Sequence, residues 1–162
     1  MSICKSFLPV VSPESRVLIL GSMPGRKSLE MQQYYAYPQN RFWKLLAALF
    51  AAELPTDYEA KLALLQKNKL ALWDVLGVCE REGSLDSDIR NEQPNNISGL
   101  LQQYPQIRAV VCNGGKAGSA FKKYFGTVVK VPVYYLHSTS PANARMNLTD
   151  LQEEWQVLKS WL

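Results

Sequence analysis

The sequence predicts an α/β fold, a three-layer α/β/α sandwich around a central, mainly parallel, four-stranded sheet. The chain has 162 residues, of which 47% are hydrophobic and 20% are charged, a composition typical of a globular domain with a sizeable core. Four short apolar segments indicate buried strands, and segments with helical periodicity alternate with them. Because no repeat, linker or change in composition divides the chain, residues 1–162 are expected to form a single domain.

The predicted strands are rich in Val, Ile, Leu and aromatic residues and are almost continuously apolar. Such runs are typical of parallel strands that helices cover on both faces of the sheet. Sequential connections between parallel strands need crossovers, which the intervening helical segments supply. The strands are predicted at residues 16–21, 70–76, 107–113 and 131–138.

Helices are predicted from apolar periodicity and from capping signals. In residues 41–52, apolar side chains recur at helical spacing and form one face. Two Thr-x-x-Glu or Thr-x-x-Gln patterns, at Thr56 and Thr149, resemble capping boxes that open a helix. The predicted helices are residues 41–52, a helix opened by Thr56, residues 116–124, and a C-terminal helix that begins at Thr149 and ends near Leu162.

Sheets of this kind place their chemistry beyond the carboxyl ends of the strands. The segments in which functional residues are expected are therefore residues 22–40, 74–91, 113–116 and 137–145. Residues 78–95 show no regular pattern, and a stretch of this length without secondary structure is typical of a functional loop.

Composition excludes several classes of protein. Lys and Arg number 18 against 14 Asp and Glu, so the net charge of +4 permits a polyanionic partner without requiring one. The three cysteines, Cys4, Cys79 and Cys112, are far apart, which argues against a disulfide framework and a four-thiolate cluster. We therefore expect no metal and no cofactor.

No apolar run approaches the roughly 20 residues that span a bilayer, and the N-terminus lacks the pattern of a secretory signal, so a cytoplasmic protein with no membrane partner is expected.

Two segments after the first strand carry candidate binding residues. The turn Gly21-Ser22-Met23-Pro24-Gly25 could expose backbone N–H groups to an anion or could be a plain tight turn. It matches neither a P-loop nor the dinucleotide-binding fingerprint. The aromatic-rich residues 34–43 could stack on a base, and within them Asn40 could serve as a helix cap instead of a functional group.

A third candidate segment follows the last predicted strand. His137 is the only histidine of the chain, so any imidazole chemistry must use it, although a structural histidine at a strand end is an equal alternative. The hydroxyl groups of Ser138, Thr139 and Ser140 could contact a phosphate.

Together these motifs resemble those of the uracil-DNA glycosylase superfamily. The resemblance rests on G-S-M-P-G-R-K-S at residues 21–28, Y-A-Y-P-Q-N-R-F-W-K at residues 35–44 and H-S-T-S-P-A-N-A-R at residues 137–145. With W-D-V-L at residues 73–76 and C-E-R-E-G-S-L-D-S at residues 79–87, the chain is most similar to the hypoxanthine-DNA (deoxyinosine) glycosylases. The resemblance covers nearly the whole chain.

Three positions depart from the pattern of the superfamily. Met23 stands where the uracil-releasing branches carry Asp or Asn to position the attacking water, and a thioether cannot do this. Tyr37 replaces a histidine, and Ser138 stands where many relatives have proline. The first departure argues against ordinary uracil release and assigns the positioning of the water to Asn40.

The resemblance implies a monofunctional enzyme that hydrolyses the N-glycosidic bond of a deaminated base in DNA, with hypoxanthine favoured, as part of base excision repair. It implies that Asn40 holds the water or orients the sugar and that Tyr35 covers the flipped base. Asp74 would accept the ring N–H of the base, and His137 would donate to the base or to a phosphate.

Backbone N–H groups near Met23 would contribute to base binding, and a monomer that binds DNA is expected. The implied phosphate contacts are Ser22, Ser138, Ser140 and Arg145, with Ser28 a weaker candidate and Arg145 also able to fill the vacated stack.

Several alternatives remain open at this point. The chain could be a uracil or mismatch glycosylase of the same fold, a catalytically inactive module that binds DNA damage, or a binder of small nucleotides. Asp74 could anchor the following loop instead of binding a base. Asp86 and Asp88 are expected to be turn and cap residues.

Overall fold

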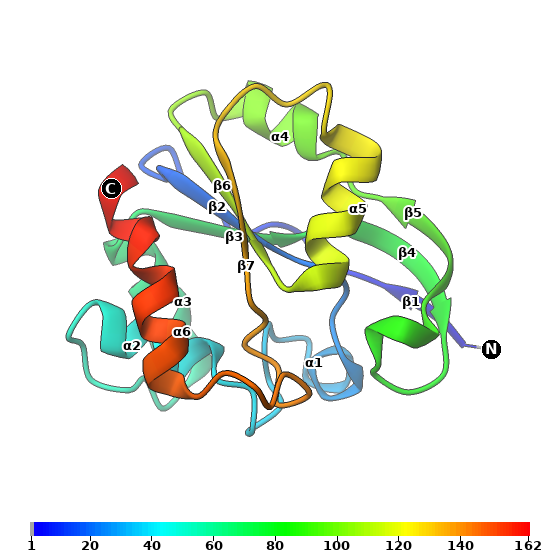
Figure 1. The fold of residues 1–162 in the computed structure, drawn as a ribbon, viewed down its shortest axis with the longest axis horizontal. Coiled ribbons are helices and arrows are strands. Elements are labelled where there is room, and N and C mark those ends of the chain that lie inside the picture. The colour runs from blue at the N-terminus through cyan, green and yellow to red at the C-terminus, as the bar shows by residue number, and fades with distance from the viewer. Residues whose placement is uncertain (1) are drawn as a thin grey trace.

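The main sheet has four strands, all parallel, in the order β3-β2-β6-β7. In the computed structural model, which describes residues 2–162, these strands are β2 (Val17–Gly21), β3 (Leu70–Asp74), β6 (Ala109–Asn113) and β7 (Val133–Leu136). Each lies within a segment that the sequence predicts as a strand. The predicted α/β fold with a four-stranded parallel sheet is thus confirmed (Figure 1).

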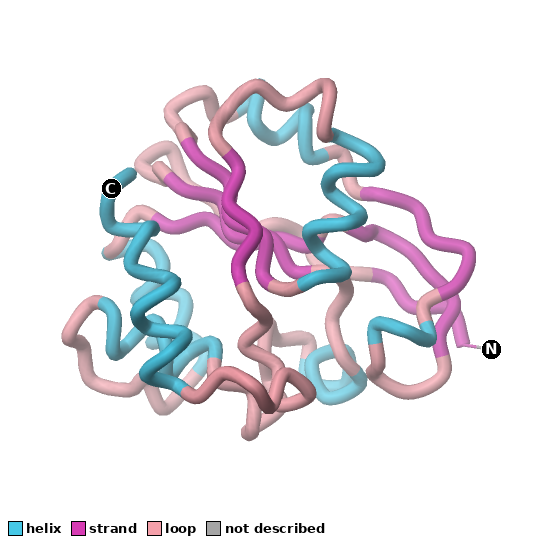
Figure 2. Tube along the Cα trace, in the orientation of Figure 1, coloured by secondary structure: helices cyan, strands magenta, loops and turns pink. Residues whose placement is uncertain are grey.

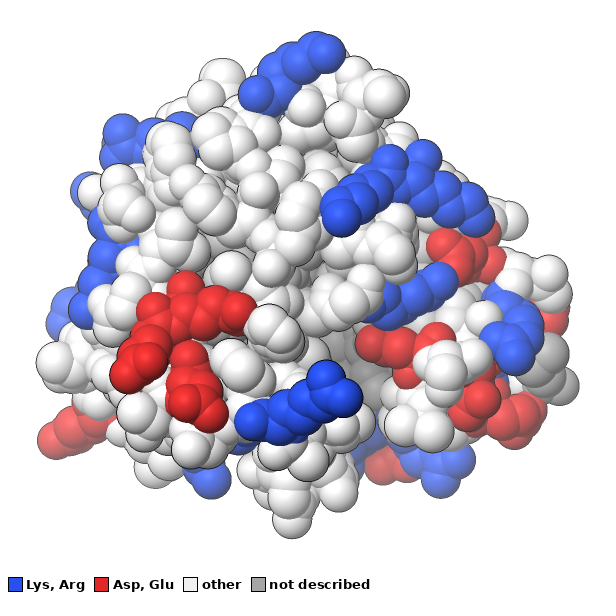
Figure 3. Space-filling model, viewed as in Figure 1, with Lys and Arg blue, Asp and Glu red and all other residues white. Residues whose placement is uncertain are grey.

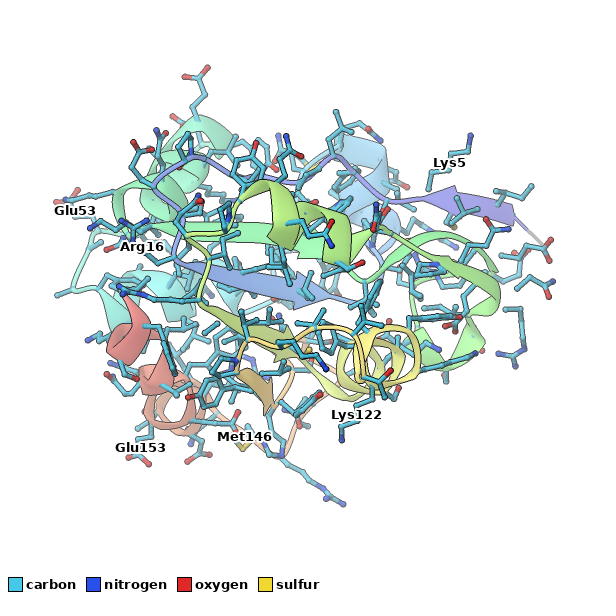
Figure 4. The ribbon with its side chains drawn as sticks, turned by 90° about the horizontal axis from the view of Figure 1, so that it is seen from above. Lys5, Arg16, Glu53, Lys122, Met146 and Glu153 are labelled. Carbon is cyan, nitrogen blue, oxygen red and sulfur yellow. The ribbon has the colours of Figure 1, made fainter. Side chains whose placement is uncertain are left out.

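Helices cover both faces of this sheet (Figures 1 and 4). Successive side chains of a strand point to opposite faces, so β2 contributes Val17 and Ile19 to one core cluster and Leu18 and Leu20 to the other. On the face of Val17 and Ile19, the cluster includes residues of α2 (Phe42–Leu49), α3 (Tyr58–Lys67) and α6 (Leu148–Trp155). The 3-10 helix η2 (Gln156–Trp161) continues α6. On the face of Leu18 and Leu20, the cluster includes residues of α4 (Ile97–Gln103) and α5 (Gly115–Phe125).

A second, antiparallel sheet was not predicted. It has the strand order β1-β4-β5, and Figure 2 shows its strands lying beyond one end of the main sheet. In Figure 4, Lys5 on β1 and Arg16, just before β2, lie toward opposite ends of the molecule. The strands are β1 (Ser2–Lys5), β4 (Leu76–Arg81) and β5 (Arg90–Pro94).

The expectation that residues 78–95 lack regular structure is therefore wrong. The strand β5 is Arg-Asn-Glu-Gln-Pro and lies exposed at the edge of its sheet, so it needs no apolar face. The loop between β4 and β5 carries a short 3-10 helix, η1 (Asp86–Asp88). Another short helix, α1 (Arg26–Met31), follows the glycine-rich turn.

The two predicted capping residues also require correction. Helix α3 is capped by Asp57, whose Oδ1 accepts a hydrogen bond from the backbone N–H of Ala60 at 2.7 Å, and not by Thr56. Helix α6 is capped by Asn147 in a reciprocal capping box with Asp150, two residues before Thr149. Within residues 2–162, no helix combines the length and the apolar character needed to cross a membrane.

Candidate active site

A cleft of about 710 Å³ opens where the strands of the main sheet end. Its floor includes Gly21 of β2, Asp74 of β3 and Asn113 of β6. One wall is the loop that follows β7, with Ser138, Thr139, Ser140, Pro141, Ala142 and Asn143, and the other is formed by residues 21–28 and 84–87. Figure 1 shows α1 and the loop after β7 on the same side of the molecule. The cleft therefore lies at the carboxyl edge of the sheet, as expected for this architecture.

A chain of hydrogen bonds connects the floor of the cleft to the loop after β7. The side-chain amide of Asn113 donates to Tyr35 Oη at 3.0 Å and to Thr139 Oγ1 at 3.1 Å, and Asn113 Oδ1 accepts from the backbone N–H of Thr139. The Thr139 hydroxyl in turn donates to Asn40 Oδ1 at 2.8 Å. Because each step joins a different segment of the chain, this network fixes the relative positions of Tyr35, Asn40 and the loop.

The same network determines which atoms of Asn40 remain available. Asn40 Oδ1 also accepts from the backbone N–H of Phe42 at 2.9 Å, so the oxygen has two protein donors at the start of α2. Since both partners donate, the orientation of the amide is fixed and Nδ2 is the group that can donate to a ligand. Asn40 lines the cleft, and its side chain accepts the N–H of Phe42, although the N-cap residue of α2 is Arg41.

Arg41 holds the loop after β7 in place. Its guanidinium donates to the carbonyl oxygens of Ser140 at 2.9 Å, Asn143 at 3.0 Å and Thr139 at 3.3 Å, and also to that of Met146. A planar guanidinium presents five N–H donors in a fixed arrangement, which suits a group of converging carbonyls. Because these contacts reach backbone atoms of the loop, they do not depend on the identity of its side chains.

Asp74 is a buried carboxyl group at the end of β3. The residue is 4% exposed, and among residues 2–162 its Oδ2 has no hydrogen-bond partner. Removal from water raises the pKa of Asp74 to about 8, the Asp86 carboxylate adds to the increase and the Arg81 guanidinium opposes it. A Cβ atom on Gly21 would lie 2.6 Å from Asp74 Oδ1 and 2.9 Å from Tyr35 Oη, so this close approach requires glycine.

The ring of Tyr35 stacks on that of Phe42, with centroids 4.1 Å apart and an interplanar angle of 20°. Phe42 is fully buried, so it supports one face of the Tyr35 ring. Tyr35 has a φ of 51°, in the left-handed region that side chains other than glycine seldom adopt. Such strain persists only where surrounding contacts enforce it, and here the stacking and the Asn113 hydrogen bond do so.

Within the second wall, side-chain hydrogen bonds join residues 84–87 to the glycine-rich turn. Ser22 Oγ donates to Asp86 Oδ1 at 2.7 Å, and the backbone N–H of Arg26 donates to Ser84 Oγ at 2.8 Å. Beneath the turn, the buried Arg81 donates to the carbonyl oxygen of Pro24 at 2.5 Å. Asp86, expected only as a turn residue, thus also bonds Ser22 and lines the cleft.

The structure brings most of the predicted site residues together. His137 and Arg145 are not among the residues that line the cleft. The His137 side chain is 60% exposed and its Nδ1 lies 2.5 Å from Glu154 Oε2, while Arg145 is exposed on the surface. The predicted residues that line the cleft are Ser22, Met23, Ser28, Tyr35, Asn40, Asp74, Ser138, Thr139 and Ser140.

Two residues that organise the site, Asn113 and Arg81, were not assigned a role from the sequence. Asn113 ends a predicted strand and Arg81 lies within the quoted motif of residues 79–87, so both positions carried a signal without a defined role. The Thr139 hydroxyl, expected as a possible phosphate contact, instead bonds Asn113 and Asn40. In the part of the chain that the structure describes, no group of three or more His, Cys, Asp or Glu side chains is placed to hold a metal.

Comparison with known proteins identifies the family. The model of the uracil DNA glycosylase superfamily matches residues 8–161. The chain belongs to this superfamily. It is 38% identical over 155 residues to a hypoxanthine DNA glycosylase from Methanosarcina acetivorans, covering 95% of this chain and 96% of the relative. A hypoxanthine DNA glycosylase from Methanosarcina barkeri is 37% identical over 144 residues, covering 87% of this chain and 89% of the relative.

The superfamily fold is also found in a solved structure. The solution NMR structure of a candidate uracil DNA glycosylase from Methanosarcina acetivorans superposes with a TM-score of 0.82 at 34% sequence identity. The superposition covers 98% of this chain and 99% of the other. The resemblance inferred from the motifs of the sequence is therefore confirmed over nearly the full length.

Proposed function

We propose that the chain is a monofunctional DNA glycosylase that releases hypoxanthine from deoxyinosine in DNA, as a cytoplasmic monomer acting in base excision repair. The observation that carries this proposal is the convergence of Asn40, Tyr35 and Asp74 on one cleft in a chain of this superfamily. The activity named for two nearly full-length relatives supports hypoxanthine as the base.

The cleft is suited to a base that has left the DNA helix. A flipped base must be bound by stacking and by hydrogen bonds to its edge. The Tyr35 ring, supported from behind by Phe42, offers a stacking surface, and Asp74 offers a polar group on the floor. Asn40 Oδ1 is engaged within the protein, and Nδ2 makes no hydrogen bond within residues 2–162, so Nδ2 can donate to the water or to the sugar.

The residues around Met23 favour hypoxanthine over uracil. Met23 lines the cleft and is 6% exposed, so its thioether occupies the position from which the uracil-releasing branches present an amide or carboxylate to the water. A thioether is a weak acceptor and no donor. Positioning of the water is thus assigned to Asn40.

The loop after β7 supplies the proposed phosphate contacts. Ser138 Oγ accepts from the backbone N–H of Ser140, and Ser140 Oγ accepts from that of Ala142, so each hydroxyl retains its proton for donation. Ser22 differs, because its proton is already donated to Asp86. Arg145 remains a candidate for contacts with the DNA backbone outside the cleft. The visible face carries separate acidic and basic groups instead of one continuous basic surface (Figure 3).

The decisive experiment measures base release from a deoxyinosine duplex by variants of Asn40. Asn40→Asp keeps the oxygen that Phe42 and Thr139 require and removes the Nδ2 donor, so it isolates the proposed role. Loss of one positioning group of this kind typically lowers the rate by about 10²–10³. We expect that loss for Asn40→Asp and Asn40→Ala, with folding and lesion binding retained.

A matched control separates this role from helix capping. Asn147→Ala removes the cap of α6, outside the cleft, which costs about 1 kcal/mol of stability, and should leave base release unchanged. Near-complete activity of Asn40→Asp would reject the role of Asn40. Lesion binding by the wild type without release of hypoxanthine would reject the enzymatic function, and release of uracil alone would reject the substrate.

A further inference from the structure

We propose that Asp74 donates a proton to the departing base and is therefore the general acid of the reaction. This inference rests on the proposed function, because it assigns a step of base release to a residue of the same cleft. It replaces the role expected from the sequence, in which an ionised Asp74 only accepts the ring N–H of the base.

The position of Asp74 fits a group that acts on the base. It ends β3 and lines the cleft, and a Cβ atom placed on Gly21 would meet both Asp74 Oδ1 and Tyr35 Oη. Two polar neighbours in the cleft have protein partners: Asn113 bonds Tyr35 and Thr139, and Asp86 accepts from Ser22. Beneath the turn, the buried Arg81 donates to Pro24 through Nη2, while its Nε and Nη1 have no hydrogen-bond partner among residues 2–162.

The carboxyl of Asp74 differs from Asn113 and Asp86, because it lines the cleft and one of its oxygens has no protein partner. Among residues 2–162, its Oδ2 is the only buried side-chain oxygen without a hydrogen-bond partner. A buried polar group left without a partner is costly, which indicates that this carboxyl is completed by a ligand.

The charge that develops during the reaction decides which form of Asp74 is useful. When the glycosidic bond breaks, negative charge accumulates on the base, and catalysis requires donors directed at that charge. A carboxylate in the same cleft would repel the charge, whereas a carboxylic acid would donate to it. A carboxyl kept neutral by an apolar site, and used as a donor at neutral pH, is an established device of enzymes.

The surroundings keep Asp74 in the acid form. The titratable and charged groups that face it are Tyr34, Tyr35, Asp86 and Arg81. Burial and the Asp86 carboxylate together outweigh Arg81, so the pKa of Asp74 is about 8. Burial also raises the pKa of both tyrosines, which therefore remain neutral and leave the balance unchanged.

The proposed step conserves atoms and charge. The bond between C1′ of the sugar and the base nitrogen breaks, and its electron pair remains with the base. The Asp74 proton moves to an acceptor atom of the base, which leaves as neutral hypoxanthine and converts Asp74 to a carboxylate. Water forms a bond to C1′ and loses a proton, and Asp74 regains a proton from solvent, so the net reaction is hydrolysis.

The two possible roles of Asp74 predict opposite pH dependence. A general acid must be protonated, so base release should decline as the pH rises through the pKa of Asp74. A carboxylate that accepts the lactam N–H must be ionised, so base release should increase over the same range. The sign of the change therefore distinguishes the roles.

The test compares single-turnover release of hypoxanthine by the wild type and by Asp74→Asn between pH 6 and about 9.5. The amide is isosteric and can donate a hydrogen bond, but it has no proton to transfer. We expect the wild-type rate to fall about tenfold per pH unit above about pH 8. Asp74→Asn should be about 10²–10⁴-fold slower at pH 7 and should lack this decline.

The variant also controls for titration of the substrate. The lactam of hypoxanthine itself ionises in alkaline solution, and any decline that persists in Asp74→Asn belongs to the substrate. A wild-type rate that increases with pH, or an identical decline in both proteins, would overturn the inference while leaving the proposed function intact. Absence of hypoxanthine release by the wild type at every pH would overturn both.

A second measurement is independent of activity. The unfolded chain loses the Asp74 proton near pH 4, whereas the folded protein retains it up to about pH 8. The free energy of unfolding of the wild type should therefore fall relative to that of Asp74→Asn as the pH rises from about 4 to about 8. A constant difference between the two proteins across this range would show that folded Asp74 is ionised at neutral pH and would also overturn the inference.

Discussion

The two walls of the cleft are held by different kinds of contact. The loop after β7 is fixed by buried hydrogen bonds from Asn113 and by the Arg41 guanidinium, which reaches four of its carbonyl oxygens. In the opposite wall, the hydroxyls of Ser22 and Ser84 join residues 84–87 to the glycine-rich turn, and the buried Arg81 makes one bond to the turn, at Pro24. The first wall is therefore held by more hydrogen bonds from buried groups, and we expect the second to be the wall that adjusts when a base enters.

The largest effect is expected at Arg41. Arg41→Ala removes the guanidinium contacts with four carbonyl oxygens of the loop and leaves only the backbone N–H of residue 41, which donates to the carbonyl oxygen of Thr139. Hydrogen bonds to charged groups contribute about 1.5–3 kcal/mol each, without full additivity, so we expect the free energy of unfolding to fall by about 2–4 kcal/mol. Release of hypoxanthine should fall about 100-fold, because Asn40 and the serines of the loop lose their support.

Urea unfolding and single-turnover base release would measure these losses. Arg108→Ala is a matched control, since Arg108 donates to one carbonyl oxygen, that of Trp161, on an exposed surface away from the cleft. If the two arginine variants lose activity equally, the loop does not depend on Arg41 for its shape.

A smaller effect is expected at Thr139, within the same wall. Thr139→Val keeps the shape of the side chain but removes the hydroxyl that accepts from Asn113 and donates to Asn40. Leaving buried partners unsatisfied costs about 1–3 kcal/mol, and base release should fall about tenfold as Asn40 loses one of its two anchors. Thr139→Ser restores the hydroxyl and should recover most of the activity in the same assay, so failure of that rescue would contradict the role of the hydrogen bond.

The sequence predicts the buried strands of the main sheet but not the exposed strand β5. The strands of the main sheet are buried on both faces, so their apolar residues form continuous runs that the sequence displays directly. The strand β5 consists of polar residues at an exposed edge and has no such pattern. The helix starts were misplaced because Thr56 and Asp57 are both good caps, and only the three-dimensional contacts decide between them.

The site likewise contains residues whose position the sequence predicts and others whose position it does not. Asn40, Tyr35 and Asp74 were predicted because each follows a strand or lies in a distinctive motif, and all three line the cleft. His137 and Ser138 are consecutive just after β7, and a sequence motif cannot show which of their side chains faces the cleft. In the structure Ser138 does, and His137 pairs with Glu154 instead.

The smallest effect is expected on the second wall, at Ser84. Ser84→Ala removes one hydroxyl that accepts the N–H of Arg26 near the surface, where water can replace it. The free energy of unfolding should change by no more than about 0.5–1 kcal/mol, and hypoxanthine release should stay within about threefold of the wild type.

Ser87→Ala is the matched control, because Ser87 lines the cleft on the same loop and, in the described part of the chain, its hydroxyl makes no hydrogen bond. Both variants would be measured in the unfolding and base-release assays used for Thr139→Val. If Ser84→Ala loses as much activity as Thr139→Val, both walls must be fixed for catalysis, and the second wall cannot be the one that adjusts to the base.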